Sequence, residues 1–201
     1  MKSQILSRRP LLMTVIIGVV LLFVFILNIL PEDQNGFEAQ VGSMFVASKK
    51  EQVSIGRPVR LIISKIKVDA VVIYVGMTSQ GAMDAPKGPN EVAWFNLGPR
   101  PGEIGSAVIS GHYGWKNNIP AVFDNLNKLQ KGDKLSIKDE KDTLTTFVVR
   151  EIRILGENDD ASPVFGSSDN GAHLNLITCG GVWDKTKKSY SKRLILFTDK
   201  E

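Results

Sequence analysis

The stretch HLNLITCGGVWDKTKKSYSKRLILFT, residues 173–198, decides the fold. It contains two apolar runs, His173–Thr178 and Arg193–Thr198, separated by glycine, lysine and serine residues. Short runs rich in branched and aromatic side chains, bounded by turn residues, are typical of buried β-strands. The stretch therefore predicts two strands joined by a hairpin-length loop.

Further runs of the same kind precede this stretch. They are VRLII (Val59–Ile63), AVVIYV (Ala70–Val75), VAWF (Val92–Phe95), SAVIS (Ser106–Ser110), KLSIK (Lys134–Lys138) and TTFVVREIRIL (Thr145–Leu155). Together the runs predict a mostly β fold of eight strands, either a closed antiparallel-rich barrel or a sandwich, since closure removes exposed strand edges. We expect one or two helical turns at Pro120–Leu129, where apolar residues recur at helical spacing after a proline suited to a helix start.

A long apolar run, LLMTVIIGVVLLFVFILNIL, occupies residues 11–30 and contains no charged residue. At about 1.5 Å per residue, such a helix is long enough to cross the hydrocarbon layer of a membrane. Lysine and arginine precede the run and acidic residues follow it, so the positive-inside rule predicts a cytoplasmic N-terminus at residues 1–10. We therefore predict a single-pass transmembrane signal anchor at 11–30, a linker at 31–52 and an extracellular domain at 53–201. A cleaved signal peptide is the alternative, but its apolar core is shorter, about 7 to 15 residues, and ends at a small-x-small site that is missing here.

Composition excludes several classes of protein. A chain of 201 residues with 43% hydrophobic residues and one cysteine is not disordered, a disulfide scaffold or a multi-cysteine zinc module. The cationic residues before the apolar run account for most of the net charge of +4, so the exterior part is close to neutral. This near-neutral charge gives no electrostatic reason to expect nucleic-acid binding.

Cys179 is the only cysteine, and it ends an apolar strand with two glycines after it. An unpaired thiol in an exported domain is either buried and inert or used as a nucleophile. A nucleophilic thiol needs a proton acceptor and a group that stabilises the oxyanion formed on the attacked carbonyl.

Two histidines and one arginine are the candidates for these roles. His173 begins the strand that ends at Cys179, about 20 Å away along an extended chain, so the base should be His112 in ISGHYG. Arg193 opens the next strand, and pairing of the two strands would return its guanidinium to the thiol. The alternatives are an ordinary loop histidine and a solvated strand arginine.

Taken together, SGHYG (Ser110–Gly114), NLITC (Asn175–Cys179) and SKRLILF (Ser191–Phe197) resemble, in order, the motifs of the sortases. Sortases are membrane-anchored cysteine transpeptidases of Gram-positive and related bacteria. The resemblance includes IPAVFDNLNKLQKGD (Ile119–Asp133), spans about residues 57–198, and is closest to the class F or class D types. One departure is Asn175, which replaces the usual first threonine of the TLxTC motif and is expected to alter local packing more than chemistry.

The resemblance implies an eight-stranded sortase-type β-barrel in which Cys179 is the nucleophile, His112 the general acid/base and Arg193 the stabiliser of the oxyanion or substrate carbonyl. It implies cleavage of an LPxTG-like sorting signal through a thioacyl enzyme at the cell membrane. The partners would be secreted proteins with C-terminal sorting signals and an amine acceptor, either a peptidoglycan amine or a pilin lysine.

Two other functions compete with this one. The L,D-transpeptidases also use an exported cysteine and histidine, but their S-x-G-C-x-R context is missing around Cys179. A membrane-anchored barrel could also bind peptide or cell wall without catalysis, because a fold alone does not establish a function.

No cofactor is expected. Some sortases do use calcium, and the loop Gly156–Gly171 has four acidic residues that suggest such a site, although solvated acidic loops are commoner. They are Glu157, Asp159, Asp160 and Asp169.

Overall fold

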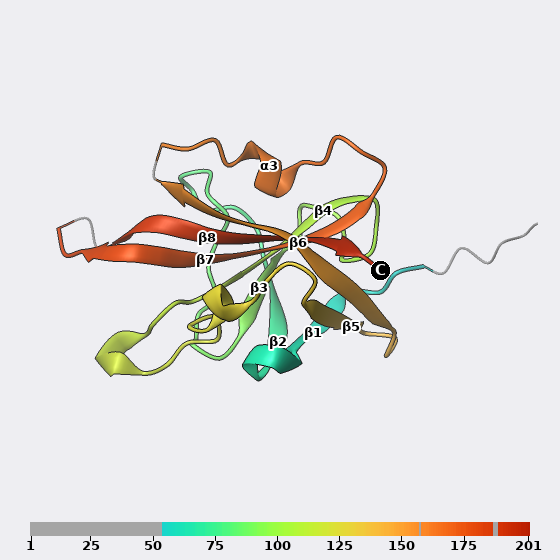
Figure 1. Cartoon of the computed structure of the whole chain (residues 1–201), viewed down its shortest axis with the longest axis horizontal. Coiled ribbons are helices and arrows are strands. Elements are labelled where there is room, and N and C mark those ends of the chain that lie inside the picture. The colour runs from blue at the N-terminus through green and yellow to red at the C-terminus, as the bar shows by residue number, and fades with distance from the viewer. Residues whose placement is uncertain (1–53, 157, 187–188) are drawn as a thin grey trace, which may run out of the picture. The chain divides into compact units, whose positions relative to one another are not determined.

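Eight β-strands close into a barrel in the computed structural model (Figure 1). The model describes residues 54–156, 158–186 and 189–201. The strands are β1 (Pro58–Ile63), β2 (Val68–Val75), β3 (Val92–Phe95), β4 (Gly105–Gly111), β5 (Lys134–Asp139), β6 (Leu144–Gly156), β7 (Ala172–Asp184) and β8 (Ser189–Lys200). Their order around the barrel is β1-β2-β3-β4-β7-β8-β6-β5. The predicted eight-stranded barrel is confirmed, and the sandwich was the wrong alternative.

The predictions for the N-terminal part, residues 1–10, 11–30 and 31–52, lie outside the described residues. In the part of the chain that the structure describes, no helix is long and apolar enough to span a bilayer.

The β7–β8 hairpin is longer than predicted, because much of the segment expected to be a hairpin-length loop continues the two strands. Pairing continues past the thiol to Trp183 opposite Tyr190, after a register shift between Gly180 and Trp183. Gly181 has a φ of +76°, a left-handed conformation that glycine adopts at low cost and that suits a bulge in the strand. Branched and aromatic residues on both sides of the bulge then favour continued pairing. The ladder therefore continues beyond Cys179, and the β7–β8 hairpin projects from the barrel (Figure 1).

The helix predicted at Pro120–Leu129 is reduced to turns and the 3₁₀ helix η3 (Leu126–Lys128). The side chains buried in the core here are Phe123, Leu126 and Leu129, which recur every three residues. The backbone hydrogen bonds also join residues three apart, from Leu126 N–H to the Phe123 carbonyl and from Leu129 N–H to the Leu126 carbonyl, which is the 3₁₀ pattern. The other short helices described are η1 (Ser64–Ile66), η2 (Lys116–Asn118) and α3 (Ser162–Phe165).

Two apolar layers lie on opposite faces of the β4–β7–β8 sheet. Leu174 and Leu176 of β7 point into the barrel and belong to its main core. On the other face, which we call the outer face, a smaller cluster forms beneath α3 from Val108, Val164, Ile195 and Phe197. Because successive side chains of a strand alternate between faces, the odd-numbered residues of β7 up to Cys179 and of β8 from Arg193 onward lie on the outer face. Cys179 and Arg193 belong to this set.

Candidate active site

Strand register places Arg193 beside Cys179. The two residues are directly opposite each other in the antiparallel β7–β8 pair. Directly paired residues of antiparallel strands project to the same face with their Cβ atoms about 5 Å apart. The expected return of Arg193 to the thiol is therefore confirmed.

His112 reaches the same place through parallel pairing. β4 and β7 run parallel, and Ser110 of β4 pairs with Ile177 of β7. His112 and Cys179 each stand two positions beyond that pair, and neighbouring strands are about 4.8 Å apart. The histidine, one residue past the end of β4, therefore lies beside the thiol in the neighbouring strand β7. All three predicted residues line one cavity of about 820 Å³.

Backbone contacts fix the end of β4 that carries His112. The buried Thr178 hydroxyl donates to the Gly111 carbonyl at 2.7 Å, joining β7 to β4 one residue before the thiol. Phe123 N–H donates to the His112 carbonyl at 3.1 Å. A Cβ atom on Gly111 would lie only 2.4 Å from the Phe123 ring, so glycine is required for this close approach. The glycine in SGHYG thus has a packing role.

A second contact determines which nitrogen of the His112 ring carries a hydrogen. Its Nε2 lies 2.7 Å from the carbonyl oxygen of Pro86. A carbonyl only accepts hydrogen bonds, so Nε2 carries a hydrogen and donates it. Nδ1 is then the ring atom that can take a proton from a thiol or return one.

The Arg193 guanidinium is held by backbone oxygens. Its Nη1 donates to the carbonyls of Tyr190 and Lys192, each at 3.0 Å. A guanidinium has five N–H donors, so Nε and Nη2 can bind a substrate carbonyl while Nη1 keeps these contacts.

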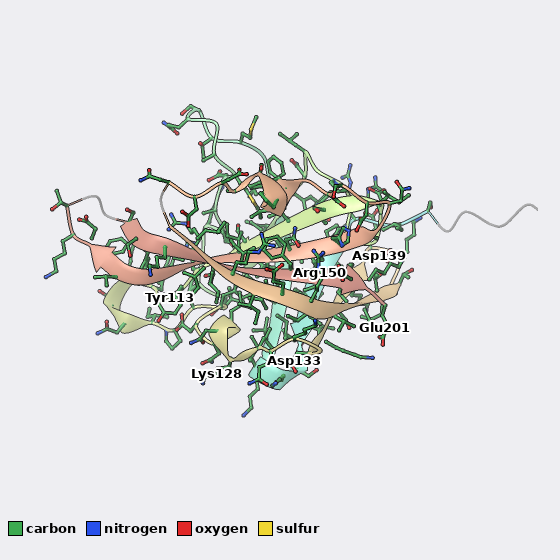
Figure 2. The ribbon with its side chains drawn as sticks, turned by 45° about the horizontal axis from the view of Figure 1, so that its top comes forward. Tyr113, Lys128, Asp133, Asp139, Arg150 and Glu201 are labelled. Carbon is green, nitrogen blue, oxygen red and sulfur yellow. The ribbon has the colours of Figure 1, made fainter. Side chains whose placement is uncertain are left out.

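Aromatic residues that the sequence analysis did not assign form much of the cavity wall. Tyr190 contacts Tyr113 and Trp183 edge to face, with ring centroids 5.6 and 5.0 Å apart. Trp115 contacts the His112 ring at 4.6 Å. Figure 2 shows Tyr113 at the end of the molecule where the hairpin projects. The sequence feature that could have identified these residues is their position: they stand next to the histidine in GHYGW and on both sides of the hairpin turn.

The Tyr190 phenol stays protonated at neutral pH. Burial, and then the nearby Tyr113, Cys179 and Asp124, raise the pKa of Tyr190 above its ordinary value. Tyr190 therefore contributes an uncharged hydroxyl group to the cavity wall.

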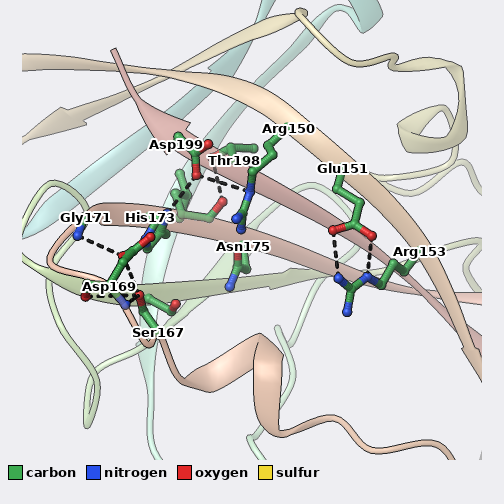
Figure 3. Close-up of polar contacts among 12 residues, drawn as sticks. Arg150, Glu151, Arg153, Ser167, Asp169, Gly171, His173, Asn175, Thr198 and Asp199 are labelled. Carbon is green, nitrogen blue, oxygen red and sulfur yellow. Dashed lines mark hydrogen bonds and ion pairs between the residues drawn. The ribbon is translucent and has the colours of Figure 1, made fainter.

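His173 lies away from the thiol, as expected. Its two ring nitrogens lie 2.8 Å from Asp199 and 2.7 Å from Asp169 (Figure 3). Burial of the imidazole opposes its protonation, but the hydrogen bonds to the two carboxylates outweigh it and raise the pKa of His173. His173 therefore ties β7 and β8 to the loop that covers the outer face.

Asn175 takes a packing role. It is buried, and its amide nitrogen donates to the Val164 carbonyl of α3 at 2.7 Å. The residue that departs from the usual motif thus fastens α3 to the sheet.

The described acidic residues of the loop suggested as a calcium site each form hydrogen bonds with a different partner. Asp159 accepts from Gly156 N–H at 2.7 Å, Asp160 from Ser162, and Asp169 from His173. Glu157 lies outside the described residues. Elsewhere in the described ranges, no group of three or more His, Cys, Asp or Glu side chains is gathered closely enough to hold a metal ion.

Comparison with known proteins addresses the family. A model of the sortase domain matches residues 61–201. No curated protein matches. Among solved structures, the chain is similar to sortase C-1 from Actinomyces oris, with a TM-score of 0.56, 21% identity, and coverage of 71% of this chain and 72% of that one. It is also similar to a lid mutant of sortase A from Corynebacterium diphtheriae, with a TM-score of 0.57, 21% identity, and coverage of 74% and 73%.

At these identities the solved structures establish the shared barrel, and the domain model, which covers more than half of the chain, establishes the family. The motifs around His112, Cys179 and Arg193 were therefore a correct guide, and the chain belongs to the sortase family.

Proposed function

We propose that the chain is a cysteine transpeptidase that cleaves an LPxTG-like sorting signal and transfers the protein to an amine acceptor. The observation that supports this proposal most directly is the convergence of Cys179, His112 and Arg193 on one cavity from three neighbouring strands, β7, β4 and β8. A thiol, an imidazole and a guanidinium are the three groups that acyl transfer through a thioester needs.

In the first step, the Cys179 sulfur attacks the peptide carbonyl while Arg193 stabilises the developing oxyanion. The C–N bond breaks, and protonated His112 gives its Nδ1 proton to the departing amine. A thioester between Cys179 and the sorting signal remains. In the second step an amine attacks this thioester, His112 takes a proton from it, and the thiol is regenerated.

The partners follow from this chemistry. The acyl donors are secreted proteins with C-terminal sorting signals, and the acceptor is a peptidoglycan amine or a pilin lysine. An anchor at residues 11–30 would hold the enzyme on the outer face of the cell membrane beside such substrates and raise their effective concentration. The class F or D assignment belongs to this proposal as well.

Intact mass measurement tests the proposal. The full chain, kept in mild detergent because residues 11–30 are apolar, is incubated with a panel of LPxTG-like peptides. We expect a peptide-sized adduct that hydroxylamine removes, and no adduct on the Cys179→Ala variant. Absence of adduct and of peptide cleavage across the panel, together with a thiol that resists alkylation in the folded protein, would favour a non-catalytic binding barrel.

A further inference from the structure

Lys116 places an ammonium group over an aromatic ring in the cavity that contains Cys179. Its Nζ lies 5.8 Å from the centroid of the Trp115 ring. The same indole contacts the His112 imidazole, with ring centroids 4.6 Å apart. Both Trp115 and Lys116 line the cavity with the thiol. A primary ammonium, an indole and the candidate base are therefore adjacent.

The short turn that carries these residues is well fixed. Trp115 N–H donates to the Ile119 carbonyl at 3.0 Å, which closes the turn. Gly114, with a φ of +65°, donates its N–H to Asp124 Oδ1 at 2.6 Å. These contacts fix the backbone that carries the indole, whereas the Lys116 side chain is exposed to solvent.

An acceptor amine has two requirements that this arrangement meets. Alkyl amines are ammonium ions at neutral pH, and among aromatic side chains tryptophan binds a cation best. The ammonium must then lose a proton to a base before its nitrogen can attack the thioester. An indole face beside His112 gathers the cation where the base can deprotonate it.

We propose that Trp115 is the binding platform for the acceptor amine, that the acceptor is a lysine-type ω-amine on a flexible methylene chain, and that Lys116 occupies this platform in the resting enzyme. The inference rests on the proposed transpeptidase function and deepens it. The kind of acceptor follows from the present occupant, which is itself a lysine side chain lying on the indole.

The transfer step balances in atoms and protons. The acceptor nitrogen forms a C–N bond with the acyl carbon, and the C–S bond to Cys179 breaks. The ammonium gives one proton to solvent by way of His112. A second proton, lost from the nitrogen as the new bond forms, returns to the departing thiolate.

The test uses the full chain, a peptide that forms the thioacyl adduct, and Nα-acetyl-lysine amide as acceptor. The partition between aminolysis and hydrolysis at increasing acceptor concentration gives the KM for the amine. We expect Trp115→Leu to raise this KM about three- to tenfold, the range of a partly exposed cation–π contact. Because Trp115 also contacts the His112 ring, the rate of thioacyl formation is measured separately and should change by a smaller factor than the KM for the amine. Trp115→Phe, which keeps an aromatic face, should fall between Trp115→Leu and the parent.

Lysine variants supply an independent arm. Lys116→Met removes the resident cation and should lower the KM for the amine. Lys128→Met removes an exposed lysine that does not line the cavity and should leave the KM unchanged. Glycinamide, whose amine is carried on a single methylene, should respond less to Trp115→Leu than the lysine derivative does.

The outcomes separate the two levels of the proposal. An adduct that forms at the parental rate in Trp115→Leu, with an unchanged KM for the amine, would overturn the platform and leave the transpeptidase intact. If Trp115→Leu raised the KM for glycinamide as much as the KM for the lysine derivative, the assignment of a lysine-type acceptor would be overturned. Failure of the parent to form any adduct would reject the proposed function and this inference with it.

Discussion

Replacement of Gly111 by alanine should damage both stability and activity, because the added methyl group has no space. The new Cβ would lie 2.4 and 2.6 Å from two carbon atoms of the Phe123 ring. Carbon atoms in favourable contact are about 3.5 to 4.0 Å apart, so the ring or the strand must move by about 1 Å. Phe123 is fully buried in the main core and has no room to retreat. Relief therefore requires a shift of the β4 end, which carries His112.

The expected magnitude follows from this overlap. Overpacking of a well-packed core costs about 1 to 3 kcal/mol. For a protein of this size, each kcal/mol lowers the melting temperature by about 2 to 4 °C, so we expect a fall of about 2 to 12 °C. Thermal unfolding of the full chain in detergent measures the fall. The rate of thioacyl formation should decrease as well, because the histidine is displaced from the thiol.

Two further variants make the interpretation specific. Gly180→Ala adds a methyl group one residue after Cys179, where the nearest atom, the Leu194 nitrogen, is 3.9 Å away. It should change the free energy of unfolding by no more than about 0.5 kcal/mol. Phe123→Leu shortens the ring side chain, so its effect combined with Gly111→Ala should be smaller than the sum of the single effects. Strict additivity, or parental melting of Gly111→Ala, would refute the steric argument.

Three other predictions concern buried polar groups. His173 pairs with Asp169 and Asp199, and its pKa is higher in the folded than in the unfolded protein. The stability from these pairs is therefore fully present below about pH 6.5, the pKa of an unfolded histidine, and is lost as pH rises through the pKa of the folded state. Urea unfolding from pH 6 to 9 should show this loss in the parent, and a His173→Gln variant that loses just as much stability over this range would contradict it. Burial opposes ionisation of Asp139, but hydrogen bonds from three backbone N–H groups outweigh it and lower its pKa, so its contribution is present above about pH 3.9 and lost as pH falls through the folded value. Asp139→Asn should cost about 1 to 3 kcal/mol in urea unfolding at pH 7, and parental stability would argue against this network. Thr178→Val leaves the β4 carbonyl without its buried donor, so we expect a loss of about 1 to 2 kcal/mol and slower thioacyl formation, with parental values for both as the contrary result.

The strands could be predicted because their composition carries the signal locally. Runs such as VRLII and SAVIS are short, branched and bounded by turn residues, and the structure places strands at each of them. The residues of the candidate site could also be predicted from the sequence. Cys179 and Arg193 flank a hairpin, and His173 is too far from the thiol along an extended strand to serve as its base. These inferences need only the period of a strand and the direction of the chain.

Features that depend on contacts between distant segments were not predictable in this way. The segment after Pro120 satisfies a helical pattern, but it forms turns and a short 3₁₀ helix, and its Phe123 packs against Gly111 of a distant strand. The extension of the hairpin depends on a single left-handed glycine at position 181. Neither effect has a sequence signature that distinguishes it from an ordinary turn.

The arrangement of strands also explains why the three candidate residues are separable in their effects. Main-chain pairing fixes Cys179 opposite Arg193, because both residues belong to the part of the β7–β8 ladder that precedes the register shift. His112 instead stands one residue beyond the end of β4, where the Thr178 hydroxyl, the Phe123 N–H and the Pro86 carbonyl hold its strand end and its ring. Substitutions around the end of β4 should therefore weaken proton transfer while leaving the thiol and the guanidinium in place. Alkylation of Cys179 at high pH, where the thiolate forms without a base, should then proceed normally in Gly111→Ala even as its peptide chemistry fails. Slow alkylation at high pH would show instead that the change had spread through β7.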